Sequence, residues 1–283
     1  MKLLRLGAPG LEKPAILHAD GTYRDLSAIV PELRGLVLTP EGMNRIRAVD
    51  PATLPILDAR MRIGPCVDRV GKFIGIGLNY SDHASETGAD IPAEPIVFMK
   101  ATSSIIGPND DVVLPRDALK PDWEVELGVV IGREARYVDE ADAMAHVARY
   151  CVVKDVSERH FQIERGGQWD KGKGCDTFGP IGPWLVTPDE IPDPQDLNLW
   201  LNVDGHRCQT GSTKTMIFPV TKLVSYVSQF MSLQPGDIIA TGTPAGVGLG
   251  MKPEPGFLKP GNVMHLGIDG LGEQRQLVQA YGD

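Results

Sequence analysis

Short apolar runs, separated by turn-forming residues, follow one another along the chain from about residue 71 onward. Each run has the length of a strand and is rich in Val, Ile and Leu. Because such side chains favour extended backbone and pack well on a sheet, each run predicts a short strand. The runs are FIGIGL, PIVFMK, VELGVVIG, ARYCVVKD, LNLWLNVDG, DIIATGTP and NVMHLGIDG.

Helical spacing of apolar residues is rarer than strand-like spacing. It is found at 139–150 and at 218–233, where Pro235-Gly236 ends the second pattern. The main body is therefore predicted to be α+β and mostly β, with a mixed sheet and peripheral helices. A regular alternation of strands and helices is not expected.

Residues 1–70 are predicted to form a small α+β domain ahead of a main domain at 71–283. The run KLLRLG predicts a first strand, and Asp20-Gly21 predicts a hairpin turn between two strand-like runs. Thr39-Pro40-Glu41 predicts a helix start, with Thr39 as the N-cap and proline at the first helical position.

The charge of the chain narrows the classes of partner. Lys and Arg number 28 against 37 Asp and Glu, a net charge of -9, and no basic run stands out. This balance disfavours nucleic acid and anionic membrane surfaces as partners. No apolar run approaches the roughly 20 residues that a bilayer needs, and the first residues, MKLLRLGAPG, do not have the pattern of a signal peptide. We therefore expect a cytoplasmic protein.

Two glutamates alternate on one predicted strand, in DWEVELGVVIG at 122–132. Side chains two residues apart point to the same face of a strand, so Glu124 and Glu126 project together. The strand continues as an apolar run on both faces, which predicts a buried environment. Unpaired carboxylates there are costly, and a hard divalent cation would relieve their desolvation and repulsion. A half-exposed strand with its polar face in water is the alternative.

A third carboxylate, Asp155, ends the apolar strand in RYCVVKDVSERHFQ. Taken alone, Asp155 is explained as the cap of a helical turn that begins near Ser157. Together with the two glutamates it completes a set of three oxygen ligands suited to Mg²⁺ or Mn²⁺. No histidine has a zinc-like spacing to these carboxylates, and the four cysteines form no CxxC pair. A hard, oxygen-liganded metal is therefore favoured.

Several further polar residues could face an anionic ligand. Arg159 and Gln162 fall close to one helical face just beyond the third carboxylate. Lys171 and Lys173 lie in a glycine-rich loop, where a lysine can face a developing oxyanion. The segment TGTP at 241–244 allows backbone N–H groups and a hydroxyl to approach a carboxylate. For the charged residues, a solvated surface is the alternative.

The stretch NYSDHASETGADIPAEP turns abruptly polar after the strand FIGIGL. Ser81 or Asp82 can cap a short helix on which His83 and Glu86 share one face. A solvated polar loop is the alternative. Beside a site of three carboxylates, the segment suits a lid that delivers its base when substrate binds. We therefore expect the histidine and the glutamate to be disordered or far from the carboxylates when no ligand is present.

The order of these segments resembles the fumarylacetoacetate hydrolase family. The motifs that carry the resemblance run from about residue 73 to 250: GLNYSDH, FMK with SSIIGP, WEVELG, VVKDVSERHFQ, GKGCDTFGPIGP and GDIIATGTPAGVG. The resemblance implies a β-roll-like catalytic domain of mixed sheet, usually in homodimers, and a Mg²⁺ or Mn²⁺ ion on three carboxylates. Gly174-Cys175 and Ala101 depart from the residues common in the family, but neither change removes a charged group.

Carried onto this chain, the resemblance implies three groups of site residues. They are the metal ligands Glu124, Glu126 and Asp155, the catalytic residues His83, Glu86 and Lys173, and the substrate-binding residues Asn79, Tyr80, Arg159, Gln162 and Thr243.

The implied activity is hydrolysis of the C3–C4 bond of a 2,4-dioxo acid. A 2,4-diketo-3-deoxy sugar acid derived from L-rhamnonate or L-fuconate would give pyruvate and a hydroxy acid. Ureidoglycolate lyase, oxaloacetate decarboxylase, hydratase and isomerase activities on the same scaffold are the alternatives, and a non-catalytic binding protein is a remote one. We expect a small 2-oxo acid as the ligand and a homodimer or higher homo-oligomer.

Overall fold

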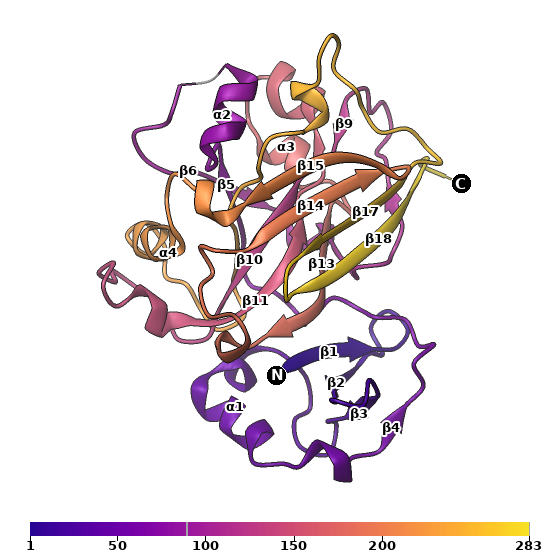
Figure 1. The fold of residues 1–283 in the computed structure, drawn as a ribbon, viewed down its shortest axis with the longest axis vertical. Coiled ribbons are helices and arrows are strands. Elements are labelled where there is room, and N and C mark those ends of the chain that lie inside the picture. Colours follow the sequence, from indigo (N-terminus) through magenta and orange to yellow (C-terminus); the bar gives the residue numbers. More distant parts are fainter. Residues whose placement is uncertain (89, 283) are drawn as a thin grey trace.

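The computed structural model describes residues 1–88 and 90–282, which form mainly β-structure (Figure 1). The strands are β1 (Lys2–Leu6), β2 (Lys13–Leu17), β3 (Tyr23–Asp25), β4 (Ile56–Leu57), β5 (Phe73–Gly77), β6 (Ile96–Lys100), β7 (Ile105–Ile106), β8 (Val112–Val113), β9 (Pro121–Asp122), β10 (Val125–Ile131), β11 (Val147–Lys154), β12 (Ser157–Glu158), β13 (Gly179–Val186), β14 (Asn198–Val203), β15 (His206–Ser212), β16 (Ile238–Ala240), β17 (Val263–Ile268) and β18 (Gly272–Gln279).

The helices are short and lie around the sheets. The α-helices are α1 (Pro40–Arg47), α2 (Ser81–Thr87), α3 (Asp170–Lys173) and α4 (Val220–Ser228). A π-helical turn, η5, spans His160–Glu164. The 3₁₀ turns are η1 (Gly35–Leu38), η2 (Pro51–Thr53), η3 (Thr102–Ser104), η4 (Ala143–His146), η6 (Pro188–Glu190), η7 (Thr213–Thr215) and η8 (Gly248–Gly250). No helix among the described residues is long and apolar enough to cross a membrane.

The larger sheet is mixed, as the sequence predicts. Its strands follow the order β4-β3-β2-β1-β13-β11-β10-β16-β5-β6, and β7 pairs with β13. Most pairs are antiparallel, whereas β16 and β5 run parallel. A smaller sheet of order β15-β14-β17-β18-β8 packs against one face of β10 and β13 (Figure 1). The prediction of a mostly β, mixed-sheet protein with peripheral helices is confirmed.

Strand β10 lies near the middle of the larger sheet and is buried along its whole length. Val125 and Leu127 point into the apolar core shared with Leu199 and Leu266 of the smaller sheet. Val130 belongs to a second core on the opposite face. Because a strand alternates its side chains, residues of even number face away from the smaller sheet, and this is the face on which the two glutamates lie.

The N-terminal strands extend the larger sheet, in indigo and purple at the bottom of Figure 1. Strand β1 pairs antiparallel with β13, with Leu3 opposite Leu185. Leu3 and Leu33 share an apolar core with Phe73 and Ile181 of the main body. Residues 1–70 are therefore joined to the main body through both backbone pairing and a common core.

Two local predictions in this N-terminal part are confirmed. Strands β2 and β3 form the hairpin, and Gly21 at its turn has a φ of +83°, which glycine adopts without a steric penalty. Helix α1 begins at Pro40, and the Thr39 side chain accepts a hydrogen bond from Gly42 N at 3.3 Å. Turn and cap chemistry depend on a few adjacent residues, so the sequence alone identifies them.

Two helical predictions are wrong. Residues 139–150 do not form one helix, because the 3₁₀ turn η4 is followed at Val147 by strand β11. Residues 157–158 pair with β9 as a strand, and the helical turn begins only at His160. In the first case the strand lies between β10 and β13, where backbone pairing and burial on both faces outweigh helical spacing.

The Arg5 side chain, nearly buried, holds together the acidic residues at the base of the N-terminal strands. Its Nε lies 2.6 Å from Glu32 Oε1, and its Nη2 lies 3.3 Å from Glu12 Oε2. We expect Arg5→Met to lower the free energy of unfolding by about 1.5–3 kcal/mol, because Glu32 loses both hydrogen bonds from the guanidinium, while Glu12 keeps Arg62.

Denaturant unfolding measures this loss. Lys13→Met is the control, since the Lys13 ammonium is half exposed and lies 3.5 Å from Asp25, so its loss costs only about 0–1 kcal/mol. Equal changes in the two variants would contradict the prediction.

Candidate active site and metal centre

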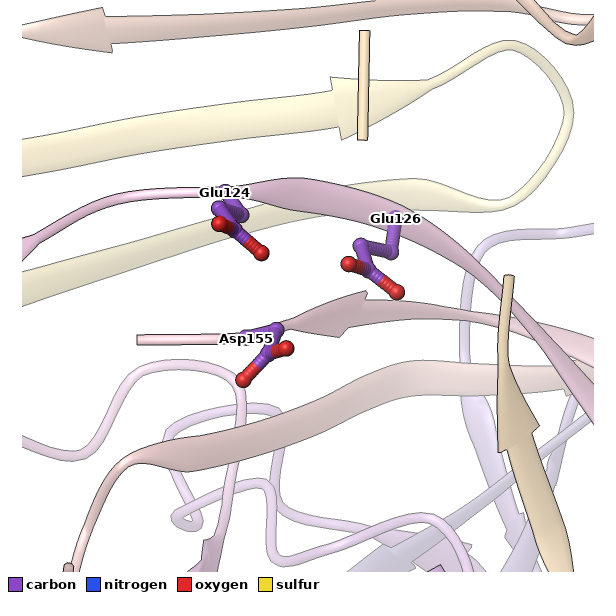
Figure 2. A group of neighbouring side chains, drawn as sticks. All are labelled: Glu124, Glu126 and Asp155. Carbon is purple, nitrogen blue, oxygen red and sulfur yellow. The ribbon is translucent and has the colours of Figure 1, made fainter. Parts of the chain in front are cut away.

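Three buried carboxylates meet at the junction of β10 and β11. Glu124 directly precedes β10, Glu126 is its second residue, and Asp155 directly follows β11 (Figure 2). Ligand oxygens from all three residues lie within 4.8 Å of one another. The antiparallel pairing places them there, because Val125 lies opposite Lys154 and Asp155 N donates to the Glu124 carbonyl at 3.1 Å. Figure 2 shows the three side chains as neighbours, the glutamates from one strand and Asp155 from the end of the adjacent strand.

Two buried lysines face this cluster. Lys173 Nζ lies 2.8 Å from Glu124 Oε2 and 2.7 Å from Asp155 Oδ2. Lys100 Nζ lies 2.6 Å from Asp155 Oδ1 and also donates to the backbone carbonyl of Lys173. Lys100 therefore ties together one candidate metal ligand and the backbone of the second lysine. Lys171, the other lysine of the glycine-rich loop, is exposed and donates to a nearby carbonyl.

Arg159 links the cluster to a further buried acid. Its Nη2 lies 2.6 Å from Glu124 Oε1, and its Nε lies 2.9 Å from Asp122 Oδ2. Its Nη1 donates to Gln162 Oε1 at 3.1 Å, which confirms that Arg159 and Gln162 share one face of the helical turn. The guanidinium thus uses its planar fork to hold two carboxylates and one amide in fixed positions.

The charges of the cluster do not balance evenly. Burial raises the pKa of Glu124, but Lys173 and Arg159 outweigh this and lower it to about 2. Burial, together with Asp155 and Glu124, raises the pKa of Glu126 well above its usual range. Burial lowers the pKa of Lys173, but Asp155 and Glu124 outweigh it, so its pKa is raised. Glu126 is therefore the carboxylate whose negative charge these cations compensate least.

A hard divalent cation fits this arrangement. Glu124, Glu126 and Asp155 offer oxygen ligands, the donors that Mg²⁺ and Mn²⁺ prefer. An ion among them would offset the repulsion that raises the pKa of Glu126. The three residues could therefore hold a divalent metal.

Helix α2 brings His83 to the same cavity. The His83 side chain is buried and lines the cavity beside Glu124 and Glu126. Its Nδ1 lies 3.5 Å from Glu86 Oε2, and Gly246 N lies 3.0 Å from both Glu86 carboxylate oxygens. The predicted helix with a shared face is confirmed. The expectation that this pair is disordered or far from the carboxylates is wrong for this structure, because the Gly246 N–H holds the helix against the cavity.

The expected cap of helix α2 is also wrong. The N-cap position is Tyr80, and no side chain caps the helix there. Asp82 Oδ1 instead accepts a hydrogen bond from His83 N at 3.0 Å. Asp82 thus supports the backbone of His83 from within the first turn.

The cavity has a volume of about 200 Å³. Most of the predicted site residues line it: His83, Glu124, Glu126, Arg159, Gln162, Lys173 and Thr243. Thr243 Oγ1 donates to the Val125 carbonyl at 2.9 Å and accepts from Gln209 at 2.8 Å. Asp155 is fully buried and does not line the cavity itself, but it contacts Lys173, which does.

Asn79 and Tyr80 lie behind the wall of the cavity. The Asn79 amide donates to the Phe218 and Thr241 carbonyls at 3.1 and 2.8 Å, and its oxygen accepts from Phe218 N. Tyr80 is fully buried in the main apolar core. The geometry gives both residues a positioning role between β5 and α2, in place of direct contact with this cavity.

The loop after β16 donates backbone N–H groups to three carboxylates. Gly242 N donates to Glu126 at 2.9 Å, Gly246 N to Glu86, and Gly248 N to Asp122 at 2.6 Å. The sequence predicts that this glycine-rich loop approaches a carboxylate, and the carboxylates prove to be the protein's own. One loop therefore connects the carboxylate cluster with helix α2.

Four residues of the site have no predicted role in the sequence. Lys100 and Asp122 stand in the motifs FMK and DWE, so a signal existed, but their partners come from distant segments. Phe98 stands in the same FMK motif as Lys100, whereas Trp169 has no local signal. Both line the cavity, although an aromatic residue in a strand or loop usually belongs to a core.

The sequence profile of the family "Fumarylacetoacetate (FAA) hydrolase C-terminal" matches residues 72–279. The chain belongs to the fumarylacetoacetate hydrolase family. A Burkholderia multivorans protein whose name goes no further than hydrolase is 66% identical over 280 residues, which cover 99% of each chain.

Solved structures of this family are similar along the whole chain. The fumarylacetoacetate hydrolase of Exiguobacterium antarcticum is 36% identical, with a TM-score of 0.88 and 99% of each chain covered. Maleylpyruvate hydrolase from Sphingobium sp. SYK-6, in complex with manganese(II) and pyruvate, is 27% identical, with a TM-score of 0.82 and 99% of each chain covered.

Glu126→Gln should affect metal binding and metal-free stability in opposite directions. The amide removes a buried charge that its neighbours disfavour, so we expect metal-free stability to stay equal or rise. We expect Mn²⁺ affinity, measured by calorimetry, to fall by more than about 10-fold, the scale of a change just outside a metal's ligands. Exposed Glu134 provides the control variant Glu134→Gln. Unchanged Mn²⁺ affinity in Glu126→Gln would refute the ligand assignment.

Lys173→Met should destabilise the metal-free protein and leave Mn²⁺ binding equal or tighter. Its loss removes one of the two buried cations that contact each of Glu124 and Asp155, while Arg159 and Lys100 remain. The lost charged hydrogen bonds cost about 1.5–3 kcal/mol. Added Mn²⁺ should restore much of this stability, which thermal unfolding with and without the ion measures. Lys171→Met, in the same loop but exposed, is the matched control. A stability loss that Mn²⁺ does not reverse would count against this charge balance.

Proposed function

We propose that this protein is a Mg²⁺- or Mn²⁺-dependent hydrolase that cleaves the C3–C4 bond of a 2,4-dioxo acid. Water adds its hydroxyl group to the C4 carbonyl carbon, the bond between C3 and C4 breaks, and C3 takes up a proton. The products are pyruvate and a second carboxylic acid. The observation that carries the proposal is that His83, whose Nδ1 lies 3.5 Å from Glu86 Oε2, lines the same cavity as Glu124 and Glu126.

The carboxylate cluster marks the end of the cavity that takes the 2-oxo acid group. When bound there, a divalent ion supplies Lewis acidity toward the substrate oxygens. The similar maleylpyruvate hydrolase structure is named as a complex with manganese(II) and pyruvate, which supports a divalent ion and a 2-oxo acid as ligands. The proposed reaction releases pyruvate, the same molecule that the name of that complex gives.

The side chains of the protein would supply the general base, the compensating charge and the orientation of the substrate. His83 takes a proton from the attacking water, and Glu86 orients the imidazole through the contact at Nδ1. The Lys173 ammonium offsets negative charge that develops on the departing pyruvate group. Arg159 and Gln162, fixed to each other at 3.1 Å, orient the acid at the same end.

Among 2,4-dioxo acids, we propose a 2,4-diketo-3-deoxy sugar acid such as L-2,4-diketo-3-deoxyrhamnonate. Its hydrolysis gives pyruvate and lactate. The small cavity of about 200 Å³ supports a short substrate. L-Fuconate gives the same dioxo acid, because the two parent acids differ only in configuration at C2 and C4, and both of these positions are carbonyls in the dioxo acid.

The alternative functions leave some of the residues around the cavity without a role. Decarboxylation of oxaloacetate needs no attack by water, so a histidine held by a carboxylate favours hydrolysis. Ureidoglycolate lyase, hydratase and isomerase activities need a different substrate on the same residues. A non-catalytic binding protein would keep a costly set of buried charges without using it. The homodimer and the cytoplasmic location stay predictions.

The test is a panel of 2,4-dioxo acids, oxaloacetate and ureidoglycolate, each incubated with Mg²⁺ or Mn²⁺ and analysed by mass spectrometry. Pyruvate with a second carboxylic acid supports the proposal, and exhaustive chelation should abolish the reaction. Carbon dioxide would identify a decarboxylase and urea a lyase. Full activity after chelation would exclude the metal-dependent mechanism.

His83→Ala should lower kcat for the best dioxo acid by about 10²–10⁴-fold, the usual contribution of a general base. Mn²⁺ affinity should stay near that of the parent protein, because the imidazole is not among the proposed ligands. Exposed His206 provides the control variant His206→Ala, which should keep full activity. A His83→Ala variant as fast as the parent protein would remove the histidine from the mechanism.

A further inference from the structure

The cavity has two chemically different ends. Its polar end holds the carboxylate cluster with Lys173 and Arg159. His83, Gln162 and Thr243 also line the cavity, and the apolar part of its wall comes from Phe98, Ile163, Trp169 and Leu249, with β5 beneath them. If the polar end binds the 2-oxo acid group, as the proposed function requires, the apolar wall faces the substituent on C4 of the substrate.

The aromatic part of this wall is built into the sheet. The rings of Phe98 and Trp169 lie 5.5 Å apart between centroids, at an angle of 56°. Both rings rest on glycines of β5: a Cβ on Gly75 would lie 2.1 Å from Phe98 Cζ, and one on Gly77 would lie 2.4 Å from Trp169 Cζ3. Because any larger residue at these glycines would displace a ring, the strand itself shapes an apolar surface.

The cations of the cavity are all engaged at the polar end. Lys173 contacts Glu124 and Asp155, and Arg159 contacts Asp122 and Glu124. No other lysine or arginine lines the cavity among residues 1–88 and 90–282. A carboxylate on a C4 substituent that packs against Phe98 and Trp169 would therefore lie without a counter-charge, a costly arrangement for a desolvated ion.

We propose that this site selects 2,4-dioxo acids whose C4 substituent is uncharged and largely apolar, and that it rejects those ending in a second carboxylate. Phe98, Trp169, Ile163 and Leu249 determine this specificity. The inference rests on the proposed function and adds the substrate class. The lactoyl group of the sugar-acid candidate carries no charge and belongs to the selected class.

A matched pair of substrates tests the proposal. 2,4-Dioxoheptanoate and 2,4-dioxoheptanedioate have the same chain length and differ only in a terminal methyl or carboxylate group. With the Mn²⁺-loaded protein, we expect kcat/KM for the first acid to exceed that for the second on the order of 100-fold, the scale of an unpaired buried charge. Equal or faster cleavage of the dioate overturns the inference and leaves the proposed hydrolysis standing.

Calorimetric binding of the same two acids to Mn²⁺-loaded His83→Ala separates recognition from turnover. Tighter binding of the heptanoate supports the inference. If the parent protein cleaves neither acid, that absence of cleavage contradicts the proposed reaction, but the difference in binding still supports the inference. Tighter binding of the heptanedioate overturns the inference.

A charge added at the mouth of the cavity should shift the preference. Ile163 is half exposed there, and Ile163→Arg offers a cation to a terminal carboxylate. We expect the preference for the heptanoate to shrink by about 2–5-fold, the range of a partly exposed ion pair. Leu119→Arg adds the same charge on an exposed residue outside the cavity lining and should leave the ratio unchanged. An equal shift in both variants, or none in Ile163→Arg, argues against the apolar wall.

Discussion

The burial of three like charges beside one another is the constraint on which the rest of the site depends. Glu124, Glu126 and Asp155 lie at the centre of a packed sheet, where desolvated carboxylates repel one another strongly. Lys173 and Arg159 compensate part of this charge and hold the oxygens in place. The remaining imbalance is what makes the cluster suitable for a divalent ion.

The glycine-rich loop after β16 connects this cluster with the proposed general base. Its N–H groups reach Glu126 through Gly242 and Glu86 through Gly246. Both glycines have positive φ values, +92° and +102°, which larger residues rarely adopt. The backbone conformation of one loop therefore sets the position of helix α2 and a carboxylate of the cluster together. This coupling explains why His83 already lies at the cavity.

Features that depend on neighbouring residues were predictable from the sequence. The alternation of Glu124 and Glu126 on one face, the helical start at Thr39 and the strand runs all follow from local spacing and propensity. The confirmed family membership rests on the order of several such motifs. Where a local pattern competed with sheet pairing, as at 139–150, the prediction failed, because β11 gains burial on both faces and hydrogen bonds to two neighbours.

The sequence by itself determined which residues are candidates for metal binding and catalysis, because their types and spacings can be read within short segments. Only the tertiary structure decided how they are combined. Lys100 meets Asp155 from 55 residues away, and Trp169 comes to rest on Gly77, which is 92 residues before it. The physical reason is that electrostatic compensation and cavity shape depend on distances of a few ångströms between segments. Those distances are set by sheet register and packing, to which residues far apart in the chain contribute together.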